Sequence, residues 1–189
     1  MNKLRLPVLL IISAFAVFMI QACNKDSISA TANTTAAFQA NIDGSTWAPD
    51  TVSSVVTFDP TAITKTLTCI GTANQKQVIF SVQIPNAPST AGFPLGTYAI
   101  DGNQVKAQFN TQQLSNGNYV FLPQGVVAPG SGQIVVTAVD SVKKTITGTF
   151  NFYSRATVYD GSGNVVSTTV DNISSGAFTA IHYLFSNNQ

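Results

Sequence analysis

Acid–base chemistry in this sequence would have to come from its acidic side chains and its one histidine. All eight acidic residues are Asp, there is no Glu, and His182 is the single histidine. A glycosidase-type site needs two carboxylates held roughly 5 to 9 Å apart. Here the Asp residues are isolated, and nearly all stand beside Gly, Pro, Ser or Asn. Because such Asp side chains typically close local turns, we expect no catalytic residue and no enzyme.

The histidine and the glycine-rich segment 160–164 are the remaining candidates for catalysis or metal binding. His182 lies in an alternating run that places it on one face with Ala180 and Leu184. No nucleophile motif accompanies it, and one histidine without a pair of free cysteines does not make a zinc site. Asp160-Gly-Ser-Gly-Asn164 resembles the start of a calcium loop but lacks the closing Glu. We expect a structural or surface histidine, no metal and no cofactor.

The two cysteines, Cys23 and Cys69, stand in different contexts. Cys69 lies in an apolar alternation, which predicts a small buried side chain. Cys23 follows two positive charges near the N-terminus and an uncharged, mostly apolar run over residues 6–20. That run is shorter than the roughly 20 residues that a spanning helix needs. The pattern therefore predicts a cleaved secretory signal.

The residues around Cys23 resemble two signals of bacterial lipoproteins. Ile20-Gln21-Ala22-Cys23 resembles a lipobox, although Gln21 departs from the usual small residue. The resemblance implies cleavage before Cys23 and a diacylglycerol on its thiol, so that the membrane is a partner through the lipid. Lys25-Asp26 resembles an export tag of Bacteroidota lipoproteins, which implies the outer membrane, on its periplasmic or cell-surface face. A free Cys23 and an uncleaved anchor stay open as alternatives.

These signals divide the chain into three parts. Residues 1–22 are a predicted signal peptide, residues 23–35 a lipidated cysteine with a flexible polar tether, and residues 36–189 one domain. The mature chain would carry seven basic and eight acidic residues, because two of the nine basic residues leave with the signal. A balance so close to neutral argues against nucleic acid as a partner.

The domain consists of short runs with period-two alternation separated by turn residues, which is typical of β-strands. The expected strands cover residues 38–42, 63–69, 78–84, 97–100, 105–109, 119–122, 133–139, 145–153, 157–159, 165–170 and 176–185. We predict an all-β fold, an antiparallel sandwich of about ten strands. A lipocalin-like up-and-down barrel is the alternative. The sandwich is favoured because runs such as Val78–Phe80 are apolar on both faces.

Two further features could mark a binding or modification site. Trp47, the one tryptophan, is expected to pack in the core or at an edge, with a ligand platform on an exposed face as the alternative. Ser27, Thr51 and Ser141 each follow an Asp and precede an aliphatic residue. That pattern resembles the O-glycosylation acceptor of exported Bacteroidota proteins, so modification at one or more of them is a hypothesis.

Short segments along most of the domain resemble a group of uncharacterised Bacteroidota envelope lipoproteins that share a domain of unknown function. The segments are Phe38–Trp47, Gly96–Tyr98, Gly132–Ile134, Asp140, Ile146–Phe152 and Gly176–Phe178. The resemblance implies an envelope lipoprotein and brings no activity, substrate or catalytic residue.

These observations predict a non-enzymatic envelope lipoprotein whose specific role the sequence does not name: it binds a protein or glycan partner, or it is structural. One alternative is a lipocalin-like carrier, which requires a closed barrel around an apolar cavity. The other is a glycan-acting enzyme, which requires two Asp residues brought together in one cleft.

Overall fold

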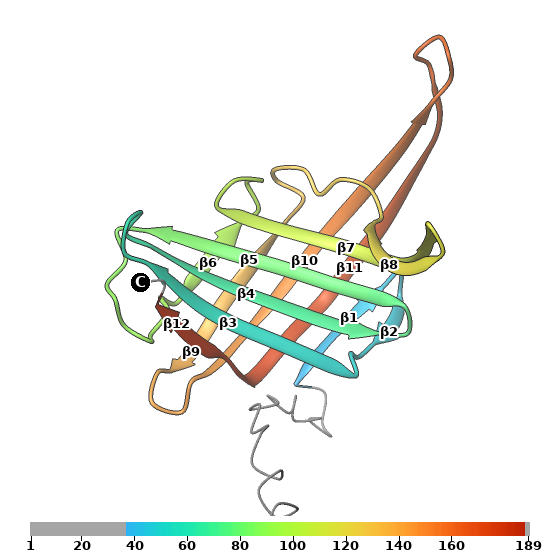
Figure 1. Cartoon of the computed structure of the whole chain (residues 1–189). Helices are drawn as coiled ribbons and strands as arrows, with labels where there is room; N and C mark the ends of the chain where they lie inside the picture. Colours follow the sequence, from blue (N-terminus) through green and yellow to red (C-terminus); the bar gives the residue numbers. More distant parts are fainter. Residues whose placement is uncertain (1–36, 188–189) are drawn as a thin grey trace, which may run out of the picture.

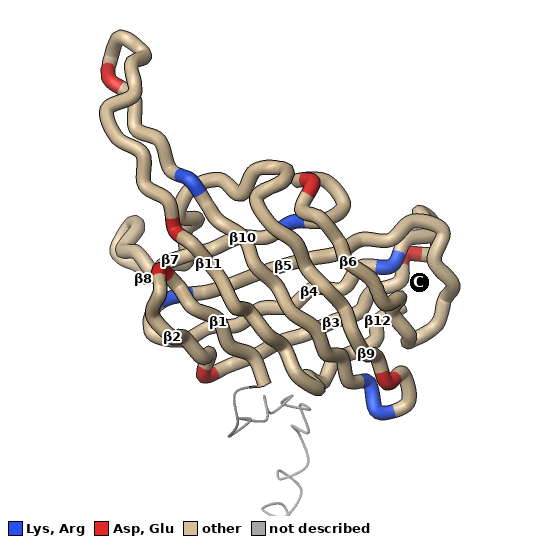
Figure 2. The backbone as a smooth tube through the Cα atoms, turned by 180° about the vertical axis from the view of Figure 1, so that it is seen from behind, with Lys and Arg blue, Asp and Glu red and all other residues tan. Residues whose placement is uncertain are grey.

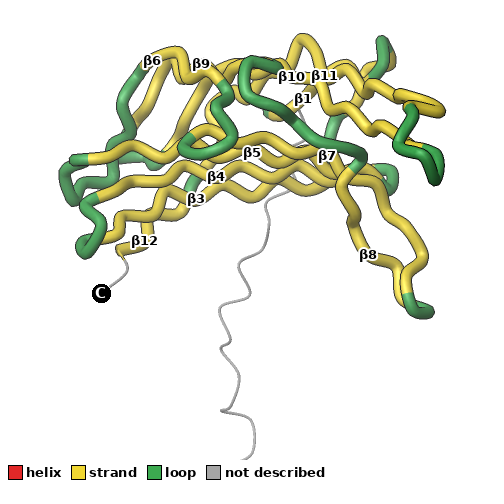
Figure 3. The backbone as a smooth tube through the Cα atoms, turned by 90° about the horizontal axis from the view of Figure 1, so that it is seen from above, coloured by secondary structure: helices red, strands yellow, loops and turns green. Residues whose placement is uncertain are grey.

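The computed structural model describes residues 37–187, which form two six-stranded sheets packed face to face (Figures 1 and 3). Across the first sheet lie β2 (Ser45–Trp47), β1 (Phe38–Ile42), β11 (Val165–His182), β10 (Thr145–Tyr159), β9 (Gly132–Asp140) and β6 (Gly96–Ala99). Across the second lie β12 (Leu184–Asn187), β3 (Thr51–Asp59), β4 (Thr64–Ala73), β5 (Lys76–Pro85), β7 (Val105–Ser115) and β8 (Asn118–Pro123). The predicted β-sandwich is confirmed. The barrel alternative is wrong, because each sheet ends in its own edge strands.

Strict alternation in the sequence explains why the strands of the second sheet bury one face. In β4, Lys65, Leu67 and Cys69 are buried, and the residues between them are partly exposed. A tight turn joins β4 to β5, and its residues Asn74 and Gln75 have φ angles of 50° and 60°. Positive φ at both central residues matches the twist of a two-residue hairpin. Within residues 37–187 we find no helix that could span a membrane.

Phenylalanine rings from both sheets meet in the middle of the sandwich. The ring centroid of Phe150 lies 5.0 Å from that of Phe38 and 5.2 Å from that of Phe80, which belongs to the opposite sheet. Gly176 makes this approach possible, because a Cβ there would lie 2.6 Å from the Phe150 ring. The packed rings fill the space in which the carrier hypothesis requires a cavity.

Several strands differ from their predicted extents. β3 has no counterpart among the expected strands, although alternate residues along it are buried. β10 and β11 are each continuous where the sequence suggested two segments, because small and polar residues interrupt the apolar alternation while the backbone pairing continues. The last predicted strand, residues 176–185, is divided: the chain leaves the first sheet after β11, and β12 pairs parallel with β3 in the second.

Candidate functional site

The two ends of the sandwich are built differently. At the closed end, the chain turns back in the β3–β4 turn, the loop 86–95 and the β9–β10 turn. At the hairpin end, two β-ribbons project, one from each sheet (Figures 1 and 3). We call residues 153–172 of β10 and β11 the arm, and residues 110–123 of β7 and β8 the second hairpin.

Exposed apolar side chains gather at the hairpin end. Of the fifteen large hydrophobic residues that are exposed within residues 37–187, eleven belong to the arm, the second hairpin or the chain that follows it. These are Leu114, Tyr119, Val120, Leu122, Val126, Tyr153, Val158, Tyr159, Val165, Val166 and Val170. An apolar concentration on one side of a water-soluble domain is typical of an interaction surface.

The outer part of the arm is exposed on both faces and almost uncharged. Every residue from 158 to 170 is exposed, and between residues 156 and 170 the one charged residue is Asp160 at the tip (Figure 2). The Asp160 carboxylate accepts hydrogen bonds from the backbone N–H groups of Ser162 (2.9 Å) and Asn164 (2.8 Å). The hydrogen bond from the Asn164 side chain contributes most to lowering the pKa of Asp160, and these two backbone hydrogen bonds lower it further. The carboxylate is therefore used to hold the turn, as Asp residues in tips commonly are.

At the base of the arm the structure brings two carboxylates near each other. Burial raises the pKa of Asp171, and the negative charge of Asp43 raises it further, while Ser154 and Lys76 act in the opposite direction. The Asp43 carboxylate already accepts the backbone N–H of Asn172 at 2.8 Å. This is the kind of Asp pairing that the enzyme hypothesis requires, and no sequence pattern indicated it. Within residues 37–187, no three metal-binding side chains of the His, Cys, Asp or Glu type come together.

At the closed end, a buried lysine forms hydrogen bonds with the loop 86–95. The Lys65 ammonium donates to the Gly92 carbonyl (2.6 Å) and to the Thr90 hydroxyl (3.2 Å), and its residue is 1% exposed. The Tyr183 hydroxyl donates to the Ala91 carbonyl at 2.8 Å. Burial lowers the pKa of Lys65. The loop is thus held by a side chain of β4 and by one from the connection between β11 and β12.

Trp47 does not provide the exposed platform considered from the sequence. It is 5% exposed, its indole N–H donates to the Ala73 carbonyl at 3.2 Å, and its ring packs edge-on against Phe38. The physical reason is that Trp47 pairs with Ala40 in the β1–β2 hairpin, so that its side chain faces the second sheet. The expected core packing therefore describes this residue.

Cys69 is buried, as expected. Its sulfur lies 3.2 Å from the Ser54 hydroxyl oxygen. Burial raises the pKa of the Cys69 thiol to about 12, although the Ser54 hydrogen bond acts in the opposite direction. A thiol with such a pKa is a poor nucleophile at neutral pH.

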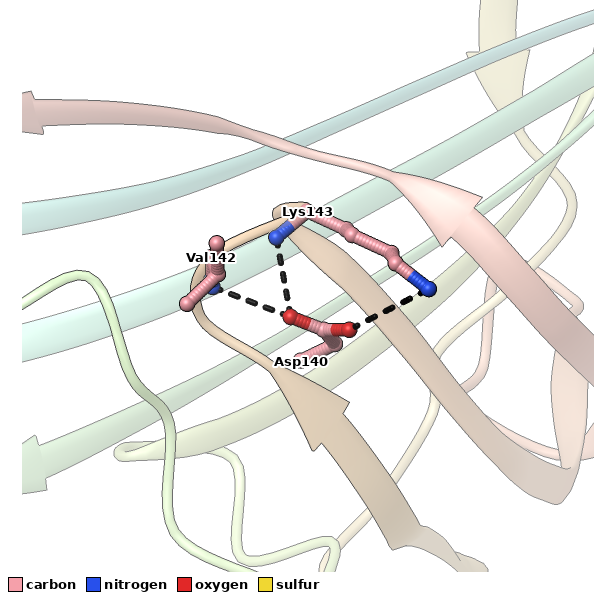
Figure 4. Close-up of polar contacts among 3 residues, drawn as sticks. All are labelled: Asp140, Val142 and Lys143. Atoms are coloured by element: carbon pink, nitrogen blue, oxygen red, sulfur yellow. Dashed lines mark hydrogen bonds and ion pairs between the residues drawn. The ribbon is translucent and has the colours of Figure 1, made fainter.

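Most other candidates lie on the surface. His182 is exposed at the end of β11. The Asp140 carboxylate accepts the backbone N–H groups of Val142 (3.0 Å) and Lys143 (2.8 Å), which confirms its predicted turn-forming role (Figure 4). Ser141 is exposed in this turn, and Thr51 is exposed at the start of β3. The predicted signal peptide, Cys23 and Ser27 lie outside the described residues.

The sequence of the arm predicts ordinary sandwich strands, and the structure differs from that expectation. A usable signal was present. Large buried side chains on the inward face stop at Phe152 and return at Ile173. The inward positions between them are mostly small or polar, such as Ser154, Ala156 and Asp171, with Val158 near the tip as the exception. A strand pair that continues without large core-facing side chains has nothing to pack against, which predicts that it leaves the core.

Comparison with known proteins places the chain in a family. No curated protein and no solved structure matches it. A family model described as a domain of unknown function (DUF6252) matches residues 34–182, which include both ends of the sandwich. The chain therefore belongs to the DUF6252 family.

Proposed function

We propose that this protein is a lipid-anchored protein of a Bacteroidota outer membrane, and that it acts by binding a partner at its hairpin end. The observation that supports the proposal best is the gathering of eleven exposed large apolar side chains at that end. Such a surface is costly to leave in water unless something covers it. The lipobox-like segment ending at Cys23 supports the anchor.

The point at which the chain enters the domain fits an anchored binding protein. β1 pairs Phe38 with Phe178 and Ile42 with Ile173, so the chain enters the first sheet away from the arm and runs towards its base. Fifteen residue steps separate Cys23 from Phe38. Even fully extended, that length reaches at most about 50 Å. An anchor at Cys23 would hold the domain near the membrane and leave it free to turn its arm towards a partner.

A catalytic role is not part of the proposal. The carboxylates of Asp101, Asp140 and Asp160 accept backbone N–H groups of their own turns. Such carboxylates are held in the ionised form and are poor proton donors. Asp43 and Asp171 are the carboxylates that the structure brings closest to such a pair, and a glycan-cleaving activity that Asp171→Asn abolishes would support the enzyme alternative.

Photo-crosslinking in cells tests the binding surface. A benzophenone amino acid is placed at Tyr159 in the arm or at Tyr119 in the second hairpin, and at Val142 as the control. Val142 is 90% exposed but lies at the closed end. We expect discrete higher-mass adducts from the two hairpin-end positions and none from Val142. Equal labelling from all three positions, or labelling from none, would contradict a binding surface at the hairpin end.

The anchor has its own test. Cys23→Ser should abolish incorporation of labelled palmitate and move the protein from the membrane fraction to the soluble fraction. Ser29→Ala is the control, because it changes the predicted tether and leaves the cysteine intact. If Cys23→Ser still carries the label, the anchor assignment is wrong.

O-glycosylation at Ser27, Thr51 or Ser141 remains a prediction. The exposure of Thr51 and Ser141 supports it, because an acceptor hydroxyl must be accessible. An intact mass equal to that of the acylated chain alone, measured on protein from a Bacteroidota host, would contradict it. A mass increase that Ser141→Ala or Thr51→Ala removes would identify the acceptor.

A further inference from the structure

The arm leaves one edge of β11 without a neighbouring strand. β1 ends at the arm's base, where the Asp43 N–H donates to the Asn172 carbonyl (2.9 Å) and the Asn172 N–H donates to the Asp43 carboxylate (2.8 Å). In an antiparallel ladder, alternate residues direct both backbone groups to the same edge. The N–H and C=O groups of Val170 and Thr168 therefore point the same way as those of Asn172. No described strand pairs with them on that side.

The sequence along this edge carries none of the usual protections. Residues Val165–Val170 read Val-Val-Ser-Thr-Thr-Val, in which five of six side chains are β-branched. Proteins usually block an open edge with Lys, Pro, inward charges or a covering loop. Uncharged segments of this composition pair readily with another strand. A two-stranded ribbon is also marginally stable alone, so it gains from a further strand.

Building on the proposed function, we propose that the partner of the arm is a second copy of this chain, paired edge to edge and antiparallel along Val165–Val170. A strand that pairs with this edge must itself be exposed, rich in β-branched residues and unpaired along one edge. Val165–Val170 has all three properties, so one copy of the segment can pair with another. No charged residue lies between 161 and 170, so two copies meet without like-charge contact (Figure 2). The contact is then reciprocal, as in most two-fold dimers.

Charge also decides the direction of pairing. Parallel arms would place the two Asp160 tips side by side, which is unfavourable. Antiparallel arms keep the two tips apart, and antiparallel ladders are also slightly more stable per residue than parallel ones. The contact is small compared with the roughly 1,200 Å² of a standard interface. The pairing is therefore weak and reversible, and it gains from confinement of both copies to one membrane.

Thiol crosslinking on the full-length protein in membranes tests this pairing. Thr168→Cys places a thiol at the centre of the paired edge. Cys69 contributes little background, because burial raises its pKa to about 12, and Cys23 is acylated in the proposed function. With a bismaleimide of about 10 Å reach, we expect a product of twice the mass. Ser162→Cys at the tip should give none, because antiparallel pairing separates the two tips by roughly 30 to 40 Å.

Two more variants make the result decisive. Val142→Cys at the closed end reports random collision and should give no dimer. Val170→Lys, added to Thr168→Cys, places a charge on the paired edge and should reduce the dimer at least tenfold. Val170 is 46% exposed, so folding should be unaffected, which circular dichroism checks.

Each result has a clear meaning. A Thr168→Cys dimer that Val170→Lys suppresses supports the pairing. A dimer from Ser162→Cys overturns the antiparallel direction, and one from Val142→Cys overturns the specificity. If Thr168→Cys stays monomeric while Tyr159 photo-crosslinks to another protein, self-pairing is wrong and the proposed binding function stands. If neither experiment gives a product, both proposals fail.

Discussion

At the closed end, Lys65 of β4 and Tyr183, between β11 and β12, donate to the carbonyl groups of one loop, whereas at the hairpin end the apolar side chains of the arm are exposed to solvent. The first arrangement satisfies polar groups inside the molecule and contributes to folding. The second arrangement leaves apolar surface exposed, and surface that is not buried contributes nothing to the stability of the fold. The difference indicates that stability and binding capacity are concentrated at different ends of one sandwich, a division that substitutions at each end can test.

The largest effect is expected for Lys65→Ala at the closed end. The change removes a buried stem and a charge-assisted hydrogen bond to Gly92, so the free energy of unfolding should fall by about 2 to 4 kcal/mol. Urea denaturation measures it. Lys143→Ala is the control, because that side chain is exposed and its ion pair with Asp140 is 4.0 Å long; its effect should be about 0.5 kcal/mol or less. Equal decreases in the free energy of unfolding for Lys65→Ala and Lys143→Ala would show that Lys65 does not stabilise the closed end.

Tyr183→Phe should have the next largest effect. It removes a single hydrogen bond to the Ala91 carbonyl while keeping the buried ring. We expect a loss of about 1 kcal/mol and faster amide exchange in the loop 86–95. Tyr159→Phe in the arm is the matched control, since Tyr159 is 60% exposed. If the loop exchanges at the same rate in both variants, Tyr183 does not hold it.

Asp171 and Asp140 should respond to pH with opposite signs. The pKa of Asp171 is raised by burial, so its ionisation weakens folding as pH rises from about 3.8 through the raised value. The pKa of Asp140 is lowered by the Lys143 N–H, so its contribution is present above 3.8 and is lost as pH falls through the lowered value. At pH 7, Asp171→Asn should therefore stabilise the fold slightly and Asp140→Asn should destabilise it.

Urea midpoints at pH 7 and pH 3 measure both variants. For the partly exposed Asp171 the gain should be about 0.5 kcal/mol or less, because solvent screens the charge. Both differences from wild type should shrink at pH 3. A destabilised Asp171→Asn protein at pH 7 would show that this carboxylate supports the base of the arm.

The smallest effect on folding is expected in the arm. Val158→Thr and Val165→Thr change residues that are 55% and 59% exposed, so the free energy of unfolding should change by about 0.5 kcal/mol or less. Val136→Thr, at 2% exposure, places a hydroxyl in the core and should cost about 1 to 3 kcal/mol. The arm variants should nevertheless reduce photo-crosslinking at Tyr159. A large loss of stability from Val158→Thr would show that the arm belongs to the folding core.

Much of the fold was predictable because period-two alternation is a local property. The runs around Leu67 and Phe80 indicated strands with one buried face, and the structure confirms them. The strand β3 was not expected, because Ser and Thr occupy several of its positions and weaken the apolar pattern. The division of the last strand was also not predictable from local patterns, because the pairing of β12 with β3 joins residues more than 120 positions apart.

The candidate site was less predictable than the fold. The sequence leaves both core packing and an exposed ligand platform open for Trp47, and pairing in the β1–β2 hairpin places its side chain in the core. Valines of the arm have the same local pattern as valines of the core, so alternation alone does not separate them. What separates them is whether another sheet lies opposite, and that depends on the whole molecule.

The sequence by itself determined the strand-rich domain, the turn-forming role of residues such as Asp140, and the burial of Cys69, because each follows from neighbouring residues. The tertiary structure alone decided that the sheets form a sandwich with open edges, that Lys65 closes one end, and that the arm leaves the other. The physical reason is that burial of a strand face requires a second layer, and only the packing of distant strands shows where that layer stops.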